Sequence, residues 1–411
     1  MTSDVTQVLA LNSGSSSLKF AIYAVSAGTG ERLTVSGELT GIAGAGHLVI
    51  RDMAGGPTVE RRVSLPDHAA ALHLVLRTLG EHAGIWRYDA VGHRVVHGGA
   101  ELAAPRRIEP DLIRALRALI PLAPEHLPQA ISIIEAVATA HPDLPQVACF
   151  DTAFHHTMSE VARIYALPHH LTDGGRLRRY GFHGLSYEAI VAALEREGGA
   201  AASGRIVAAH LGNGASMCAL RDGRSVDTTM GFTPSGGLVM GTRTGDLDPG
   251  ALLYLMERYQ LTVAQARGVV SHESGLLAVS AGAQAGSADV RDLLARETED
   301  PAAALALALF CYQARRFLGA LTAVLGGLDA LVFTGGIGEH ASAIRARICE
   351  RLGHLGIALD DARNAASAPV ISSAGSAVIV RVMATEEERM IARHTAALLG
   401  GSQPAPASPG A

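Results

Sequence analysis

Several residue classes are scarce in this sequence, and each scarcity argues against a class of function. Aromatic residues are only 4% of the 411 residues, too few for the stacking platforms that bind single-stranded nucleic acids. Lys and Arg total 34 against 39 Asp and Glu, so a net charge of −5 provides no basic field for nucleic acid or an anionic membrane. The few cysteines form no CxxC pair, and we expect reduced, mostly core thiols rather than disulfides or a zinc site at Cys149, Cys218, Cys311 and Cys349.

Signals for export or membrane insertion are also missing. The N-terminal residues Met1–Val5 lack the basic region of a signal peptide. The longest apolar run, Ala302–Tyr312, is too short to span a bilayer. We therefore expect a cytoplasmic protein that binds neither nucleic acid nor membrane.

Glycine, by contrast, is abundant, with 46 residues, about 11% of the chain where about 7% is usual. Hydrophobic residues make up 48% of the chain, enough for sizeable cores. Together these values favour loops built from bare backbone in a globular protein. At roughly 150 residues per domain, the length predicts two or three domains.

Apolar runs of strand length alternate with helical patterns, which favours an α/β architecture. We expect strands at Val8–Leu11, Leu18–Tyr23, Ala90–Val96, Gln146–Phe150, Ile206–His210, Ser216–Leu220, Ala330–Phe333 and Val378–Met383. We expect helices at Asp67–Ala83, Asp111–Leu119, Gln129–Ala140, Tyr187–Glu197, Ala251–Tyr259, Pro301–Leu325 and Glu386–Leu399. Residues 401–411, rich in Gly, Ser, Pro and Ala, are expected to form a flexible tail.

One pattern occurs twice in the chain. An apolar run, a turn of small residues and a second apolar run are found around Asn12–Ser17 and again around His210–Ser216. Each predicts two strands joined by a turn that exposes backbone N–H groups. The recurrence suggests a duplicated fold.

The first of these turns has a composition suited to phosphate. Asn12–Lys19 combines a glycine turn, three serine hydroxyls and one ammonium group, and all of these can donate to phosphate oxygens. It is not a Walker A loop, because GxxxxGK[ST] is absent from the chain. The structural alternative is an ordinary polar hairpin turn.

Charged residues and histidines follow several predicted strands. Arg94 in Gly92–Gly99 could hold a carboxylate or phosphate with its planar guanidinium, whereas His93 and His97 fit core positions better than metal ligation. Asp151 follows a buried strand and could face a crevice or cap the next segment. His183, between two glycines, could approach a ligand or be structural.

Three later segments also carry candidate chemistry. Gly231–Gly250 concentrates glycines, two carboxylates and Arg243, as in an active-site loop or a long irregular connection. Phe333–Glu339 has the pattern of a strand, a glycine turn and a helix, which offers backbone to a nucleotide without a full GxGxxG spacing. Thr385–Glu388 fits a capping box, with a Mg²⁺-binding carboxylate as the functional alternative.

Taken together, the segments resemble the acetate kinase family. The resemblance rests on LALNSGSSSLKF, GHRVVHGG, FDTAFH, RRYGFHG, HLGNGAS, DTTMGFTP with MGTRTGDLDPG, and FTGGIGE, which occur in family order from Asn12 to about Ala392. It implies an α/β, two-domain duplicated ribonuclease-H-like fold of the sugar kinase and actin type. Residues 1–150 plus 385–400 would form an N-terminal domain with the phosphate loop and acyl site. Residues 151–384 would form a C-terminal domain with the adenosine site and the interface of a homodimer.

The same resemblance implies a role for individual residues. Catalysis would involve Asp151, His183, Arg243 and Arg94, and the acid would contact Arg94, Val96, Phe182, Pro234 and His126. ATP would be held by Ser15, Ser17, Lys19, His210, Leu211, Gly212, Asn213, Gly214, Asp289, Val290, Arg291, Gly336, Ile337, Gly338, Glu339 and His340. Mg²⁺, with Mn²⁺ as an alternative, would be bound at Asn12 and Glu387, and ATP or ADP would be the co-substrate.

The reaction implied is reversible, Mg²⁺-dependent, in-line transfer of the ATP γ-phosphate to acetate, giving acetyl phosphate and ADP. Glu125 stands where the family usually has a pocket leucine, so propionate or another short-chain acid is an alternative acceptor. A non-catalytic, actin-like ATP switch is the alternative from another class of protein. The presence of Arg94, Asp151, His183 and Arg243 argues against it, because a pure switch would not need a clamp for an acid.

Overall fold

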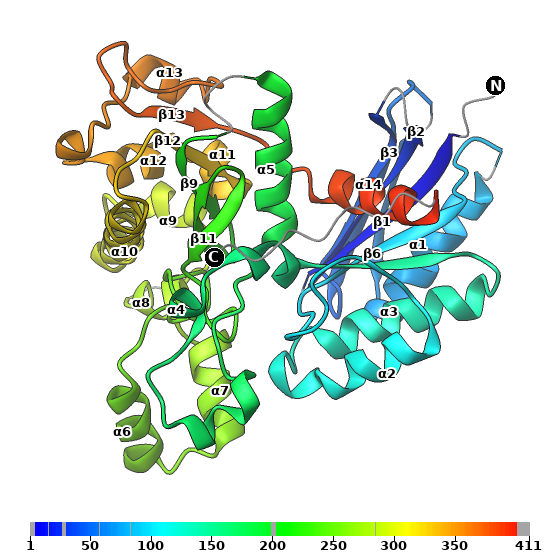
Figure 1. Ribbon diagram of the computed structural model, residues 1–411, viewed down its shortest axis with the longest axis horizontal. Helices are drawn as coiled ribbons and strands as arrows, with labels where there is room; N and C mark the ends of the chain where they lie inside the picture. The colour runs from blue at the N-terminus through cyan, green and yellow to red at the C-terminus, as the bar shows by residue number, and fades with distance from the viewer. Residues whose placement is uncertain are drawn as a thin grey trace. The chain divides into compact units, whose positions relative to one another are not determined.

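The computed structural model describes residues 5–14, 16–26, 30–56, 58–82, 84–198, 203–283 and 285–400. The chain divides into two compact units. Unit 1 contains the described residues up to Phe154 together with Glu386–Gly400, and unit 2 is His155–Thr385. Figure 1 labels their helices and strands.

Unit 1 is built on an eight-stranded sheet in the order β5-β4-β3-β2-β1-β6-β8-β7. Neighbours from β5 to β1 are antiparallel, whereas β1, β6 and β8 are parallel to one another. The strands are β1 Thr6–Ser13, β2 Ser17–Ser26, β3 Gly30–Thr40, β4 Ala45–Asp52, β5 Thr58–Ser64, β6 Ala90–Val95, β7 Arg106–Arg107 and β8 Gln146–Phe150.

Helices cover both faces of this sheet, because β1 and β2 carry apolar residues on both sides. Leu9 and Leu11 pack with α1 and α3 in one core, whereas Val8 packs with Ala392 of α14 in another. Gly92 on β6 lets α14 approach closely, since a Cβ there would lie 2.3 Å from the Thr395 hydroxyl. The helices of this unit are α1 His68–Glu81, α2 Pro110–Ala118, η1 Ile120–Leu122, α3 Leu127–Ala140 and α14 Glu387–Leu399, and η2 Asp151–Thr157 crosses into unit 2.

Unit 2 repeats the central part of this topology. Its sheet has the order β11-β10-β9-β12-β13, with two antiparallel pairs followed by two parallel pairs, which matches β3-β2-β1-β6-β8 in unit 1. The strands are β9 Arg205–Leu211, β10 Ala215–Arg221, β11 Arg224–Thr228, β12 Ala330–Thr334 and β13 Ile379–Val382. The two hairpins expected from the repeated sequence pattern, β1–β2 and β9–β10, occupy equivalent places, so the predicted duplicated α/β fold is confirmed.

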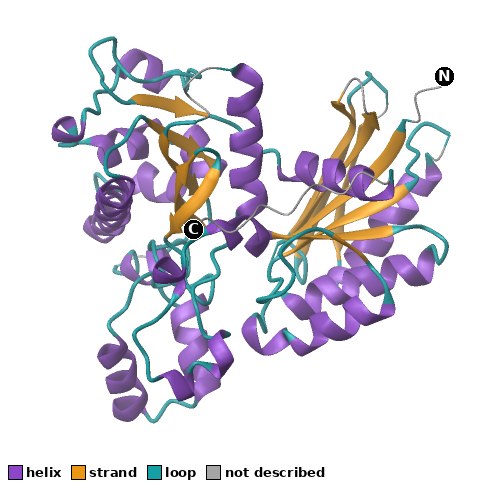
Figure 2. Ribbon diagram, in the orientation of Figure 1, coloured by secondary structure: helices purple, strands orange, loops and turns teal. Residues whose placement is uncertain are grey.

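The helices of unit 2 surround this smaller sheet and extend beyond it (Figure 2). They are α4 Glu160–Arg163, η3 His169–Leu171, η4 Asp173–Gly175, α5 Gly184–Glu197, α6 Pro249–Tyr259, α7 Val263–His272, α8 Gly275–Val279, α9 Val290–Arg296, α10 Pro301–Leu325, α11 Gly335–His340, α12 Ser342–Cys349, η5 Gly353–Leu355 and α13 Asp361–Ala365.

Helix α10 is longer than the apolar run that the sequence shows. The apolar run Ala302–Tyr312 lies inside a helix of 25 residues, which by length and composition alone could cross a membrane. The helix packs against α8, α9, α12 and the sheet of unit 2, and Leu307, Phe310 and Leu318 are buried there. A core helix passes the same test, so its composition is weak evidence for a membrane span.

All eight predicted strands and seven predicted helices are present, with ends within three residues of the prediction. The four cysteines are buried and free, as expected. Burial raises the pKa of Cys311 to about 11 and that of Cys349 to about 12, which keeps both as thiols. The predicted tail, residues 401–411, lies outside the described residues.

Candidate functional site

In unit 1, the candidate phosphate loop is the turn between β1 and β2. The Gly14 N–H donates to the Ser17 carbonyl at 2.9 Å and closes the turn. Asn12 lies opposite Lys19 in the antiparallel register, so the amide and the ammonium group project from neighbouring positions of one hairpin. Ser15 lies outside the described residues.

Arg94 is the centre of a bonded group at the carboxyl ends of the parallel strands of unit 1. Its Nε and Nη2 donate to Oδ2 of Asp151 at 3.0 and 2.6 Å, and its Nη1 donates to Oδ1 of Asn12 at 3.0 Å. Asp151 is fully buried and the Arg94 side chain is 14% exposed. Burial lowers the pKa of Arg94, but the charges of Asp151 and Glu387 outweigh it and raise that pKa, so the guanidinium stays charged.

The first turn of α14 completes this group with two carboxylates. Nδ2 of Asn12 donates to Oε2 of Glu387 at 2.7 Å and to Oε1 of Glu388 at 2.9 Å. The capping box considered for Thr385 and Glu388 is wrong, because the N-cap of α14 is Glu386 and its side chain makes no capping hydrogen bond. Glu388 is held by Asn12 instead, and the Thr385 hydroxyl donates to Ser186 in unit 2.

The two carboxylates fit a divalent cation. Burial, followed by the negative charge of Glu387, raises the pKa of Glu388, so a cation beside this pair would relieve repulsion. In the described part of the chain no three His, Cys, Asp or Glu residues form a metal-binding group. Mg²⁺ does not require one, because it usually takes one or two protein carboxylates and fills its octahedron with waters and substrate phosphates.

In unit 2, two histidines stack on each other. The rings of His183 and His210 have centroids 4.2 Å apart and an interplanar angle of 21°. His183 is the N-cap of α5 and has a left-handed backbone with φ 59°, a conformation that non-glycine residues rarely adopt and that often marks a functional site. His210 is the penultimate residue of strand β9, just before the glycine turn 212–214.

Arg243 and His183 both lie beside that glycine turn. A Cβ at Gly214 would be 3.5 Å from Nη1 of Arg243 and 3.5 Å from Nε2 of His183. Nη1 of Arg243 also donates to the Pro234 carbonyl at 3.2 Å, which links it to a predicted wall of the acyl pocket. The predicted residues His183, His210, Gly212–Gly214 and Arg243 are therefore brought together within unit 2.

Of the segments predicted to surround adenosine, α11 begins beside the strand that leads into the same turn. Gly335, with φ +75°, opens α11 against β9, where a Cβ would lie 2.8 Å from the Leu211 carbonyl. Oε1 of Glu339 accepts the Gly335 N–H at 3.0 Å and the Thr385 N–H at 3.3 Å. Asp289 caps α9 by accepting the Arg291 N–H and forms an ion pair with the exposed Arg291 side chain.

The other predicted pocket residues are distributed over both units. Val96 in unit 1 and Phe182 in unit 2 are buried, with exposed fractions of 8% and 1%. His126 is the N-cap residue of α3 but its side chain makes no capping hydrogen bond, and Glu125 beside it is half-buried. His93 and His97 have structural contacts: Nε2 of His93 meets Oε1 of Gln146 at 2.7 Å, and Nδ1 of His97 accepts the Gly99 N–H.

Several residues around these groups were not assigned a role in the site from the sequence. The pattern indicates a capping role for Glu388, although its position next to Glu387 could have indicated a pair of carboxylates. Ser216 and Tyr187 give no sequence signal, because a serine in an apolar strand and a tyrosine in a helix are ordinary residues. Arg345 is fully buried and donates to the Gly338 and Glu339 carbonyls at 2.9 Å, so it holds the end of α11.

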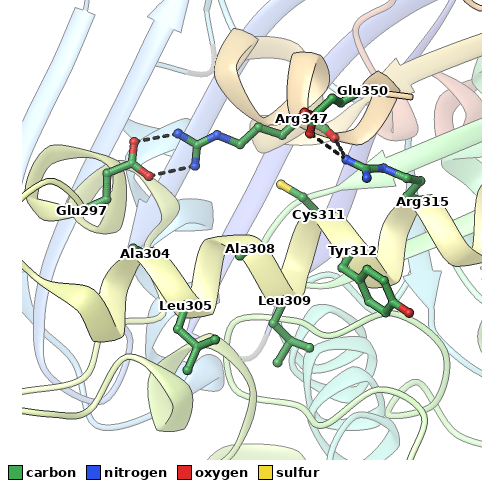
Figure 3. Close-up of a pocket in the computed structure, with 10 residues that line it drawn as sticks. All are labelled: Glu297, Ala304, Leu305, Ala308, Leu309, Cys311, Tyr312, Arg315, Arg347 and Glu350. Atoms are coloured by element: carbon green, nitrogen blue, oxygen red, sulfur yellow. Dashed lines mark hydrogen bonds and ion pairs between the residues drawn. The ribbon is translucent and has the colours of Figure 1, made fainter. Parts of the chain in front are cut away.

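A cavity of about 680 Å³ lies on a different part of unit 2 (Figure 3). Leu305, Leu309 and Tyr312 of α10 line it. Arg347 and Glu297, which form an ion pair, also contribute to its lining. None of the predicted site residues contributes to its wall.

Comparison with known proteins identifies the family of the chain. The model of the acetokinase family matches residues 7–393. An acetate kinase of Rhodopseudomonas palustris is 48% identical over 407 residues, covering 96% of this chain and 99% of the relative.

Two solved structures are similar along nearly their whole length. The acetate kinase of Porphyromonas gingivalis has a TM-score of 0.83 and 36% identity, covering 96% of this chain and 100% of that one. A propionate kinase of Francisella tularensis has a TM-score of 0.86 and 35% identity, covering 95% of this chain and 99% of that one. The chain therefore belongs to the acetokinase family.

Proposed function

We propose that this protein catalyses reversible, Mg²⁺-dependent, in-line transfer of the ATP γ-phosphate to acetate, forming acetyl phosphate and ADP. The observation that carries the proposal is the bonded group of Arg94, Asp151, Asn12 and Glu387 in unit 1. It combines a fixed guanidinium for an anion with carboxylates for a cation, in a chain that belongs to a family with named acetate and propionate kinases.

The chemistry follows from charge. A carboxylic acid is already ionised at pH 7 and needs no strong base to become a nucleophile. The obstacle is the approach of an anion to a polyanion, so the protein must supply cationic and hydrogen-bond donors at the phosphoryl oxygens. We assign this task to Lys19, Arg94, Arg243 and His183, and Arg94 also holds the acid.

Asp151 acts through Arg94 rather than as a base. Its Oδ2 receives two N–H groups of Arg94, which fixes the plane of the guanidinium. Two of the five N–H groups of Arg94 have no acceptor among the described contacts and are available to a substrate carboxylate. Asp151 is thus assigned as the residue that orients the clamp.

Asn12, Glu387 and Glu388 would hold Mg²⁺ together with the phosphates of ATP. The ion would neutralise charge on the phosphate oxygens, which the protein's own donors only partly offset. Asn12 keeps the two carboxylates in place, because its Nδ2 bonds to both of them.

The remaining assignments come from the family. His210–Gly214, Asp289–Arg291 and Gly336–His340 would bind the phosphates and adenosine. A homodimer and a cytoplasmic location are also expected, and sedimentation of the purified protein measures the first.

The acid specificity is tested by incubating the protein with ATP, Mg²⁺ and a panel of C2–C4 carboxylates, with hydroxylamine to trap the acyl phosphate. We expect an ATP-dependent hydroxamate with acetate. No trapped product with any acid would contradict a kinase function and favour an ATP switch.

Propionate or another short-chain acid is the second candidate, favoured by Glu125 in place of the usual leucine and by the similarity to a propionate kinase. A higher kcat/KM for a longer acid in the same panel would establish it. Glu125→Leu should then change the ratio of kcat/KM between acetate and propionate, whereas a surface variant such as Glu109→Gln should not.

A further inference from the structure

The Nδ1 atom of each stacked histidine of unit 2 lies within hydrogen-bond distance of a serine hydroxyl. Nδ1 of His183 lies 2.9 Å from the hydroxyl of Ser216, and Nδ1 of His210 lies 2.8 Å from the hydroxyl of Ser186. Both serines are buried, with no exposed surface. The Nδ1 atoms of both rings are thus engaged by hydroxyl groups, and Nε2 of His183 lies beside the glycine turn 212–214.

Each serine is bonded in turn to a second hydroxyl. The Thr385 hydroxyl donates to Ser186 at 2.9 Å, and the buried Tyr187 hydroxyl forms a short hydrogen bond with Ser216. Ser186 and Tyr187 are consecutive residues of the first turn of α5, directly after His183. One helical turn therefore contributes to two series of hydrogen bonds, Thr385–Ser186–His210 and Tyr187–Ser216–His183.

The direction of these hydrogen bonds determines the state of the rings. A hydroxyl has one proton to donate. Because Ser186 accepts from Thr385, its own proton is available to Nδ1 of His210. A phenol is the more acidic partner of a serine, so Tyr187 donates to Ser216, which leaves the Ser216 proton for His183. An imidazole that accepts at Nδ1 carries its proton on Nε2.

Electrostatics favours the same assignment. Two imidazolium rings with centroids 4.2 Å apart would repel each other, and the Arg243 guanidinium lies next to the same turn. Neutral rings with Nε2–H avoid that repulsion and still offer directed donors to phosphoryl oxygens.

We propose that Ser216, Tyr187, Ser186 and Thr385 are positioning residues whose two hydroxyl chains hold His183 and His210 as neutral imidazoles that donate from Nε2. The inference deepens the proposed phosphotransfer and rests on it for its kinetic consequences. The hydrogen-bond chains themselves do not depend on which acid accepts the phosphate.

The direct test is ¹⁵N NMR of the histidine rings in the full-length protein near pH 7.5, assigned with His183→Asn and His210→Asn. We expect the Nδ1 resonances of both rings to be those of an acceptor nitrogen and the Nε2 resonances those of a protonated nitrogen. Ser216→Ala should perturb His183, and Ser186→Ala should perturb His210. Protonation of Nδ1 in either wild-type ring, whether the ring is neutral or an imidazolium, would overturn the proposal.

Kinetics supplies the second test. Ser216→Ala and Tyr187→Phe should lower kcat about three- to tenfold, the value of one hydrogen bond, with little change in the KM for ATP. Loss of a donor to Nδ1 favours the protonated ring, so the acid limb of the kcat profile should move to higher pH. Ser216→Thr, which keeps the hydroxyl, should restore both properties.

Matched controls separate positioning from a general loss of stability. Tyr88→Phe removes a tyrosine hydroxyl that lies 3.4 Å from Nε2 of His141 in unit 1, and Thr322→Val removes a buried hydroxyl within α10. Both should leave kcat and its pH profile unchanged. An unchanged profile in Ser216→Ala and Tyr187→Phe would contradict the proposal. A wild-type protein that transfers phosphate to no acid would contradict the proposed function instead, while the NMR result would still decide the state of the rings.

Discussion

The side chains of the candidate site in unit 1 hold one another in place through hydrogen bonds. Asn12 uses both ends of its amide, with Oδ1 accepting from Arg94 and Nδ2 donating to Glu387 and Glu388. Replacement of any member leaves charged partners without compensation in a mostly buried setting, which costs more than the bond that is lost. The group therefore depends on the identity of each residue and not only on its charge.

Removal of either arginine assigned to the reaction should lower kcat strongly. Arg94→Ala and Arg243→Ala are each expected to lower kcat by roughly 10²–10³, the usual effect of losing a preorganised donor to a developing charge. Arg106→Ala, which breaks an exposed ion pair with Asp111, is the control and should leave kcat unchanged. Near-normal turnover in purified, folded Arg94→Ala or Arg243→Ala would reject the assigned role.

Among the elements of unit 1, α14 contributes both to the packing of the sheet and to the candidate site. It packs on β1, β2, β6 and β8, and its first turn supplies Glu387 and Glu388. Its position is also secured by Glu31 of β3, which forms ion pairs with Arg389 and Arg393. Burial raises the pKa of Glu31, but hydrogen bonds from Arg393 and Arg389 outweigh it and lower that pKa to about 2.

This ion pair predicts a specific acid sensitivity. The contribution of ionised Glu31 to the free energy of unfolding is complete above the ordinary glutamate pKa of 4.5. It is lost as the pH falls toward 2, because Glu31 then takes up a proton in the folded state. Glu31→Gln should lower the free energy of unfolding by about 2 kcal/mol at pH 7 and by much less near pH 2.5. Urea unfolding at both pH values measures the difference.

The matched control is Glu135→Gln, whose ion pair with Arg117 on neighbouring helices is half-exposed at both partners. Its effect at pH 7 should stay below about 1 kcal/mol. Equal decreases in the free energy of unfolding in the two variants would show that Glu31 does not anchor α14.

The elements also show what sequence patterns can predict. The hairpins β1–β2 and β9–β10 were predictable because apolar runs flank glycine turns that need bare backbone. Strands β4 and β5 were not, since Thr58–Ser64 is charged and largely exposed and its pairing depends on β4 alone. The glycine-bearing segments of the site were found, whereas Ser216, Tyr187 and Arg345 were missed because their roles arise from packing between distant residues.

For the whole molecule, histidines whose pKa values are lowered contribute to the response to mild acid. Burial is the main cause that lowers the pKa values of His93, His97, His155 and His156 to about 4. In the unfolded chain these rings take up protons below their ordinary pKa of 6.5, whereas in the folded protein they do so only near pH 4. The free energy of unfolding should therefore fall as the pH drops from 6.5 to 4.

Unfolding by urea at pH 7.5 and pH 5 should show this loss. His93→Gln keeps a donor for Gln146 and removes one such titration, so its stability should depend less steeply on pH. His354→Gln, at an exposed ring, should leave the slope unchanged. A wild-type stability that is constant between pH 7.5 and pH 5 would contradict this explanation.

The central claim is that the phosphoryl group passes from ATP to a carboxylate and not to water. ³¹P NMR of the protein with ATP, Mg²⁺ and acetate measures this directly through the ratio of ADP to acetyl phosphate in the first minutes of reaction. We predict that the two products appear in equal amounts, with both lost in Arg94→Ala. ADP accompanied only by inorganic phosphate would contradict the proposed transfer.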